Sequence, residues 1–284
     1  MTPRRADLLL LAATVIWGTS FVVVKDALAG ATPLAFVTLR FGIAALVLTP
    51  FAGLSRPFTR DELAAGLLLT ALIAAGFATQ TVGLVYTTPA RSAFIVAMSS
   101  VVAPGVALVV LRQRSRPWVL AALGVAGVGV YLLTAPDAGG LNRGDLWTIV
   151  TAVVFGAQIV AVAELAKRYA PRRLLWLQLV GTTLVVGAAT PLLETPLIAW
   201  TPRFVGTLLY AAVCATVIVF LWQMHAQRYM TSARAALLFC FEPVVAALAS
   251  WLWVGERLSG TQWAGGALIL AGMMLAELPS RGRL

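Results

Sequence analysis

Apolar residues run along this chain in ten segments of about twenty residues, separated by short stretches of polar, glycine and proline residues. A helix needs about 20 consecutive apolar residues to cross the hydrocarbon core of a bilayer. The pattern therefore predicts an all-α integral membrane protein with ten transmembrane helices. We place these helices at residues 6–26, 32–52, 62–84, 89–111, 117–135, 145–166, 172–193, 203–228, 231–253 and 260–278.

The amino-acid composition agrees with this prediction. Hydrophobic residues make up 60% of the 284 positions and charged residues 11%, whereas a soluble domain carries about 25% charged residues. The mean hydropathy is +0.91. The lipid bilayer is therefore the expected solvent. The net charge of +10 does not indicate a nucleic-acid partner, because the basic residues lie in short loops instead of forming one basic face.

Several other protein classes lack support in the sequence. Cys214 and Cys240 lie inside apolar segments, so no disulfide framework is expected. His225 is the single histidine and has no cluster of other ligands, so no metal site is expected. The phosphate-binding loop of ATPases is absent from the sequence, and we expect no cofactor. Two alternatives come from other functional classes. A membrane-embedded enzyme would need a catalytic cluster, and a channel-like pore would need a ring of equivalent groups. A transporter without enzyme activity is the favoured expectation.

The distribution of lysine and arginine predicts the orientation. With ten helices, 15 of the 21 basic residues fall on one side of the membrane and five on the other, and Arg40 lies inside the second helix. Cytoplasmic loops carry the excess of basic residues. We therefore expect both termini in the cytoplasm and a multi-pass protein of a bacterial cytoplasmic (inner) membrane.

The chain also repeats itself. Residues 77–93 and 220–236 match at an offset of 143, with seven of seventeen positions identical. The earlier parts of the two halves match more weakly at an offset of 138, for example at Trp17/Phe155 and Gly18/Gly156. The repeat predicts two five-helix halves, residues 1–140 and 141–284.

An odd number of helices per half has a consequence for topology. The second half must enter the membrane in the opposite direction, so the two halves form an inverted repeat. Such repeats are related by a two-fold axis in the membrane plane, place a binding site near the midplane and rock between two states. The expected mechanism is alternating access around a central cavity.

Two stretches resemble a known family. Trp17-Gly18-Thr19-Ser20-Phe21, followed by Lys25, Pro33 and Arg40, is similar to the start of EamA-type members of the drug/metabolite transporter superfamily. Residues 241–275, with Glu-Pro, then Gly-Glu-Arg-Leu and a glycine-rich last helix, are similar to the end of that family. The resemblance covers essentially the whole chain.

This resemblance implies ten helices and the export of amino acids, related metabolites or drugs. The chain looks most like the aromatic amino-acid exporter branch, so an exporter of amino acids, aromatic or hydrophobic ones included, is the favoured function. An exporter of drugs or other small metabolites is the alternative within the superfamily. The expected partners are the small-molecule substrate and lipid, and the protein is expected to be a monomer or a homodimer.

Polar and aromatic residues inside the predicted helices are the candidates for substrate binding, because such groups usually face a cavity or each other. Arg40 offers a planar fork to a carboxylate, and the glutamines offer both donors and acceptors. A packing role is the alternative for each of them. The candidate binding residues are Trp17, Ser20, Arg40, Gln80, Gln158, Trp222 and Gln223.

Two titratable residues are candidates for coupling transport to protons. Glu242 is expected about midway along the ninth helix, with a kink at Pro243. His225 is the single histidine, and histidine is the residue type whose ordinary pKa lies closest to neutral pH. A structural role is the alternative for both residues. The first half has Ser99 where the second has Glu242, so only one half supplies this carboxylate.

Overall fold

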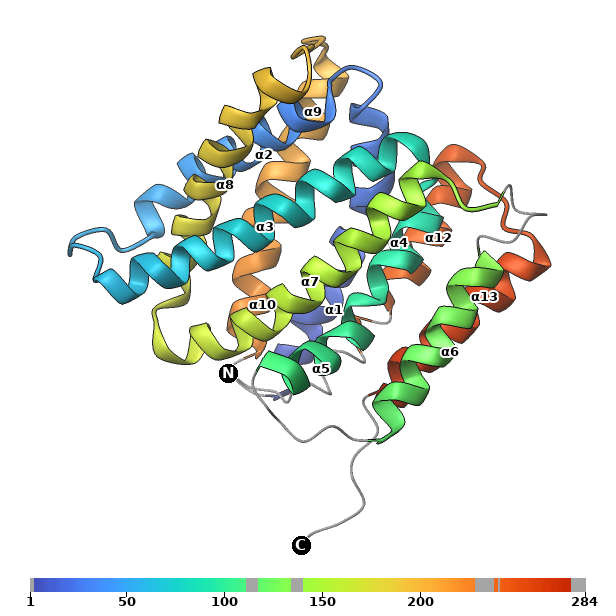
Figure 1. Ribbon diagram of the computed structural model, residues 1–284. Coiled ribbons are helices and arrows are strands. Elements are labelled where there is room, and N and C mark those ends of the chain that lie inside the picture. The colour runs from blue at the N-terminus through green and yellow to red at the C-terminus, as the bar shows by residue number, and fades with distance from the viewer. Residues whose placement is uncertain (1–2, 111–116, 134–139, 228–237, 240, 277–284) are drawn as a thin grey trace, which may run out of the picture.

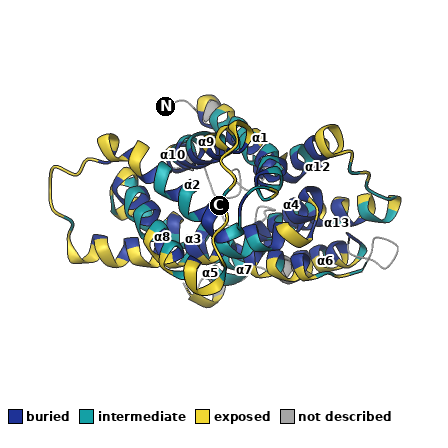
Figure 2. Ribbon diagram, turned by 90° about the horizontal axis from the view of Figure 1, so that it is seen from above, coloured by how far each residue is buried: buried dark blue, intermediate teal, exposed yellow. Residues whose placement is uncertain are grey.

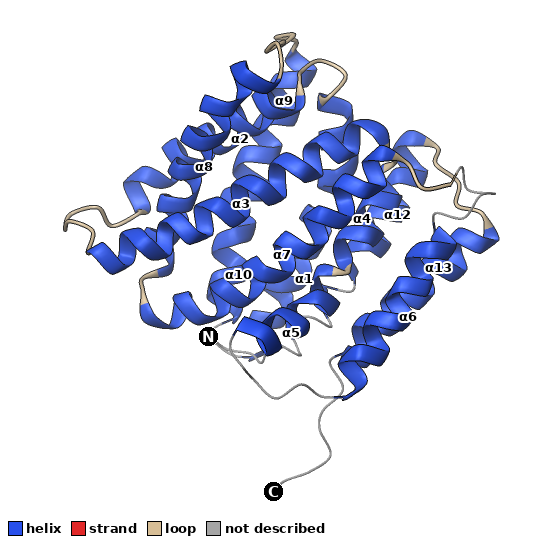
Figure 3. Cartoon of the chain, viewed as in Figure 1, coloured by secondary structure: helices blue, strands red, loops and turns tan. Residues whose placement is uncertain are grey.

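The computed structural model describes residues 3–110, 117–133, 140–227, 238–239 and 241–276. Helices account for the regular structure of these ranges, and no strand occurs within them (Figures 1 and 3). The helices are α1 Pro3–Ala27, α2 Pro33–Leu48, η1 Thr49–Phe51, α3 Arg60–Tyr86, α4 Pro89–Ala97, α5 Ser99–Val110, α6 Pro117–Leu133, α7 Arg143–Arg168, α8 Pro171–Leu193, α9 Pro202–Leu209, η3 Tyr210–Ile218, α10 Val219–Gln227, α12 Phe241–Val254 and α13 Gly260–Ala276.

Seven helical stretches of the described chain are long and apolar enough to cross a membrane. They are Arg5–Ala27, Pro33–Phe51, Arg60–Tyr86, Pro89–Ala107, Arg143–Arg168, Pro171–Leu193 and Pro202–Ala226, and shorter apolar helices cover Gly124–Leu133 and Phe241–Val254. The predicted membrane protein is thus confirmed. The number ten stays a prediction, because the predicted helices 117–135, 231–253 and 260–278 each extend beyond the described residues.

The predicted helix starts agree with the structure where proline marks them. Pro33, Pro89, Pro171 and Pro202 each occupy the first position of a helix. A proline is tolerated there because the missing N–H would have no partner within the helix. Proline therefore marks these four helix starts in the sequence.

Two predicted helices are less regular than expected. The fourth is interrupted at Met98, which separates α4 from α5. The eighth contains a π-helix, η3, between α9 and α10. Of the ninth, the structure describes residues 238–239 and helix α12, whose first turn holds Glu242 and Pro243. The kink expected at Pro243 stays a prediction, because residues 228–237 and 240 lie outside the described residues.

Close contacts join helices from distant parts of the chain. Helix α1 packs on α12, α5 on α7, α3 on α7 and α8, and α6 on α13. A β-carbon at Gly18 of α1 would lie 2.8 Å from the carbonyl oxygen of Glu242, and one at Gly156 of α7 would lie 3.2 Å from that of Ser99. Viewed from above, buried residues gather toward the middle of the bundle and exposed residues lie along its rim (Figure 2).

The rim is apolar, as a lipid-facing surface must be. Leu46, Leu192 and Leu252 are among its most exposed side chains. Arg173, at the start of α8, is a buried charged residue. It donates hydrogen bonds to both carboxylate oxygens of Glu62 and to backbone carbonyls of the α2–α3 loop. This contact fastens the start of α8 to the loop.

The contact between α6 and α13 yields a test of the packing. A β-carbon at Gly129 would lie 2.7 Å from the carbonyl oxygen of Gly265, whereas one at Gly127 would meet no atom within 4 Å. We predict that Gly129→Ala destabilises the protein by about 1–3 kcal/mol, the usual cost of overpacking. Gly127→Ala is the matched control and should change stability by less than about 0.5 kcal/mol. Thermal unfolding of the detergent-purified variants measures the difference; equal midpoints would contradict the packing.

Candidate functional site

A cavity of about 110 Å³ lies inside the bundle and is lined by 22 residues. The lining comes from α1, α2, α3, α4 and α5 in the first part of the chain, and from Phe239 and helices α7, α10, α12 and α13 in the second. Most of it is apolar, with a small number of polar side chains. Small-molecule sites in proteins have this composition.

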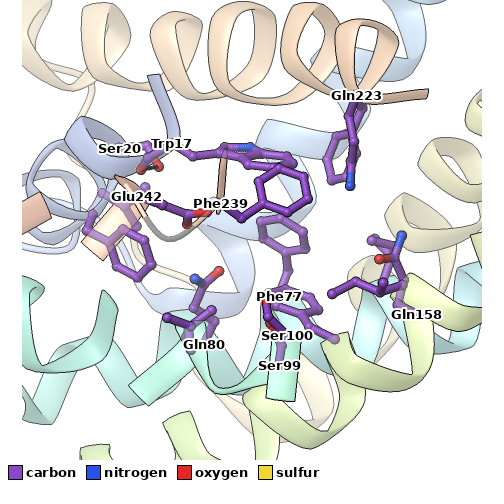
Figure 4. A pocket seen from close by; sticks show the side chains of 18 of the residues that line it. Trp17, Ser20, Phe77, Gln80, Ser99, Ser100, Gln158, Gln223, Phe239 and Glu242 are labelled. Atoms are coloured by element: carbon purple, nitrogen blue, oxygen red, sulfur yellow. Dashed lines mark hydrogen bonds between the residues drawn. The ribbon is translucent and has the colours of Figure 1, made fainter. Parts of the chain in front are cut away.

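The cavity brings together most of the candidate residues. Trp17, Ser20, Arg40, Gln80, Gln158, Gln223 and Glu242 all line it. In Figure 4, Ser20, Gln80 and Glu242 are grouped at one end, and Gln158 and Gln223 at the other. The cavity therefore has polar groups at both ends and aromatic rings between them.

Two candidate residues do not belong to this lining. Trp222 is half-buried on α10, next to the lining residue Gln223, and is not among the residues around the cavity. His225 is exposed in the last turn of α10 and does not line the cavity either. Successive residues of an α-helix point about 100° apart, so the sequence position alone did not distinguish these side chains from Gln223.

Arg40 is a buried cation. Its side chain is held by the hydroxyl oxygen of Thr216, which accepts from Nε at 2.8 Å, and by the carbonyl oxygen of Ala215, which accepts from Nη2 at 3.3 Å. The guanidinium also lies 4.7 Å from the ring centroid of Phe77. No carboxylate pairs with Arg40 in the described part of the chain. Buried charges are normally paired, so this cation is suited to an anionic ligand group.

The π-helix η3 explains how Arg40 is held. The Thr216 hydroxyl donates to the carbonyl of Ala211, five residues earlier, and so presents its lone pair to Arg40. The carbonyl oxygen of Ala215 accepts from Arg40 and, at 3.0 Å, from the indole N–H of Trp17. Single π-helical turns inside α-helices occur frequently at functional sites. One irregular turn thus positions two cavity side chains.

Glu242 brings the opposite charge to the cavity. It lies in the first turn of α12, where the helix dipole favours a carboxylate. No hydrogen bond or ion pair of its side chain occurs within the described residues. At the start of α5, Ser99 also lines the cavity but carries no charge.

Aromatic rings form the wall between the polar ends. Trp17 packs edge-to-face on Phe220 at 5.5 Å, and Phe77 lies 5.3 Å from Phe155. Phe239 completes the set, 5.9 Å from Trp17. The four phenylalanines were not among the candidates, although the repeat carried the signal: Phe155 is matched to Trp17, and Phe220 to Phe77.

Most residues that line the cavity form pairs at equivalent positions of the two sequence repeats. Fourteen of the 22 residues form seven pairs separated by 138 or 143 positions. These pairs are Trp17/Phe155, Ser20/Gln158, Phe21/Ile159, Phe77/Phe220, Gln80/Gln223, Val96/Phe239 and Ser99/Glu242. Equivalent positions of the two sequence repeats therefore face the same cavity.

Comparisons with known proteins agree with a transporter. An uncharacterized transporter of Archaeoglobus fulgidus is 31% identical over 273 residues, which cover 96% of this chain and 86% of the relative. The uncharacterized transporter YwfM of Bacillus subtilis is 27% identical, with 97% of this chain and 94% of the relative covered. A crystal structure of a protein with 18% identity matches 97% of both chains with a TM-score of 0.69, a likeness that shows the fold.

A family model adds the decisive match, since it fits the chain twice. The model of the EamA-like transporter family matches residues 4–135 and again residues 142–278. The two matches together cover nearly the whole chain. This multi-pass membrane protein therefore belongs to the EamA-like transporter family, within the drug/metabolite transporter superfamily.

Proposed function

We propose that this protein exports amino acids across a bacterial cytoplasmic membrane by alternating access. In this proposal the chain has ten spans in two inverted halves, residues 1–140 and 141–284. The single observation that carries it is the cavity, which contains both Arg40 and Glu242, neither of them in an ion pair within the described residues.

Three observations support the inverted repeat. Seven residue pairs at the repeat offsets line one cavity, and the family model matches each half separately. In addition, the contact of Gly18 with the start of α12 has an equivalent in the contact of Gly156 with the start of α5. Each half therefore lends its first helix to the other half, as a two-fold axis through the cavity requires.

The distribution of basic residues supports the orientation. In the proposed topology α1 begins in the cytoplasm, so Arg56, Arg60 and Arg173 lie on the cytoplasmic face, hereafter the inner face. Lys25, Arg91 and Arg203 then lie on the opposite, outer face. The excess of basic residues on the inner side follows the rule for cytoplasmic loops.

The charges of the cavity favour a zwitterion. Burying an uncompensated charge is costly, so a ligand that supplies both partners binds better than one that supplies neither. The guanidinium of Arg40 is suited to a carboxylate, and Glu242 to an ammonium group. The aromatic wall of Trp17, Phe77 and Phe220 suits an apolar or aromatic side chain. An amino acid combines all three features.

Glu242 is a better candidate for proton coupling than His225. A carboxylate that binds either the substrate ammonium or a proton, but not both, couples the two flows in opposite directions. Glu242 lines the cavity and can make this choice, whereas His225 is exposed outside it. The energy source would then be the proton gradient.

A panel of radiolabelled substrates in proteoliposomes tests the function. We expect saturable counterflow of one or more amino acids, and faster efflux of internal substrate when the external medium is acidic, because inward proton flow then drives export. Transport of drugs or other metabolites without any amino acid would support the alternative within the superfamily. Conductance at the rate of a channel would overturn alternating access.

Arg40 provides the first mutational test. We predict that Arg40→Gln raises the KM for amino acids about 10- to 100-fold, since a hydrogen bond to a charged group contributes about 1.5–3 kcal/mol. Transport of the corresponding amine, which lacks the carboxylate, should not lose affinity. Arg143→Gln is the matched control, because Arg143 is exposed at the start of α7. Equal losses for acid and amine would contradict the assignment of Arg40 to the carboxylate.

Glu242 provides the second mutational test. We predict that Glu242→Gln abolishes the acceleration by external acid, while exchange of substrate persists with a raised KM. Neutral glutamine keeps the shape of the side chain but can neither release a proton nor neutralise an ammonium. Efflux measured with and without a pH gradient is the readout, and Asp61→Asn, at an exposed position of α3, is the control. An unchanged response to the gradient would show that Glu242 does not couple transport.

A further inference from the structure

Two ion pairs join helices at the outer face. Arg203 at the start of α9 donates two hydrogen bonds to Asp26 near the end of α1, at 2.8 and 2.6 Å. Arg91 at the start of α4 pairs with Asp145 at the start of α7, and both side chains are buried. Each of the two helices that carry these arginines, α4 and α9, begins with a threonine N-cap followed by a proline. Both pairs therefore fasten rigid helix ends.

The buried pair Arg91–Asp145 is held by further hydrogen bonds to neighbouring residues. Asp145 also accepts from the hydroxyl of Thr87 and from the backbone N–H of Asn142, and Arg91 also donates to the carbonyl of Gly140. The pair thus joins two stretches of the chain, residues 87–91 and 140–145. The pair Asp26–Arg203 differs, because its side chains are 35% and 79% exposed and have no other partner within the described residues. It can open without leaving a buried charge.

The repeat places equivalents of Asp26 and Arg203 at the inner face. The offset of 138 relates Asp26 to Glu164 on α7, and the offset of 143 relates Arg203 to Arg60 on α3. Arg60 directly follows the N-cap Thr59 of α3, and Arg203 stands two residues after the N-cap Thr201 of α9. Helices α3 and α7 pack on each other, as α1 and α9 do.

The inner equivalents are not paired with each other in this structure. Glu164 accepts from Lys167 of its own helix at 3.0 Å. Arg60 has no ion pair within the described residues and is exposed. The same two kinds of charge are therefore present at both faces, but only the outer set is joined. The structure is asymmetric where the sequence repeat is symmetric.

We propose that Asp26–Arg203 and Glu164–Arg60 are alternating latches of the transport cycle. In an inverted repeat, each half adopts the arrangement of the other when the cavity changes sides. The outer latch then opens and the inner latch forms between α3 and α7, with Glu164 exchanging Lys167 for Arg60. In this structure the outer latch is closed. The inference rests on the inverted topology of the proposed function, but it does not depend on the identity of the substrate.

The latches bias the cycle modestly. An exposed ion pair changes the ratio of two states by about two- to fivefold. Such a bias is small enough for the substrate to overcome and large enough to measure. Removing one latch should therefore shift the population toward the state held by the other latch, without stopping transport.

Cross-linking tests the alternation without any substrate. In a background with Cys214→Ser and Cys240→Ser, the pair Arg60→Cys/Glu164→Cys is treated with a short bifunctional thiol reagent in proteoliposomes. We expect cross-linking to become two- to fivefold faster when Asp26→Asn opens the outer latch. A rate that does not respond to Asp26→Asn would overturn the proposal. Because no transported molecule is needed, failure of the amino-acid assignment would not affect this result.

Charge exchange distinguishes the proposed partner of Glu164 from the present one. We expect Glu164→Arg to slow transport, and the additional change Arg60→Glu to restore at least half of the lost rate. The matched control combines Glu164→Arg with Lys167→Glu and should not restore it. Restoration by Lys167→Glu instead, or no effect of Glu164→Arg, would show that Glu164 acts only within its own helix. Thermal midpoints of all variants separate these effects from loss of folding.

Discussion

Helix α1 approaches α12 to a distance that only glycine permits. A β-carbon at Gly18 would lie 2.7 Å from the β-carbon of Val245 as well as 2.8 Å from the carbonyl of Glu242. This contact places Trp17 and Ser20 opposite the first turn of α12, and the contact of Gly156 does the same for Phe155 and α5. The cavity wall is thus assembled by two close crossings. A larger side chain at either glycine would separate the helices that form the wall.

Charge inside a lipid-exposed bundle is the second constraint. Arg40 is 3% exposed and meets a hydroxyl, a carbonyl and an aromatic face instead of a carboxylate. These dipoles hold the guanidinium without neutralising it. The side chain of Glu242 likewise has no ion pair within the described residues and lies in the first turn of α12. In the proposed function, a ligand that carries both charges compensates both groups.

Much of the architecture could be predicted from the sequence. Segment length and proline positions identified the membrane helices, because bilayer thickness and the missing proline N–H constrain the chain locally. Six of the seven candidate binding residues line one cavity, together with Glu242. The repeat also carries the signal for two of the aromatic rings, because it relates Phe155 to Trp17 and Phe220 to Phe77.

The remaining features depend on packing between distant segments. The π-helix η3 could not be predicted from the sequence of residues 210–218. The side chains that donate to its Ala215 carbonyl, Trp17 and Arg40, belong to other helices. Trp222 and Gln223 are adjacent in sequence, and only the rotation of α10 decides which one faces the cavity.

The central claim is that one cavity compensates the two charges of a zwitterion. Calorimetric titration of the purified protein in lipid nanodiscs tests it directly, with an amino acid that the protein transports, its decarboxylated amine and its deaminated acid. The account predicts that the amino acid binds at least about tenfold more tightly than either analogue, since each analogue leaves one buried charge unpaired. Equal affinity for the amino acid and either analogue would contradict it.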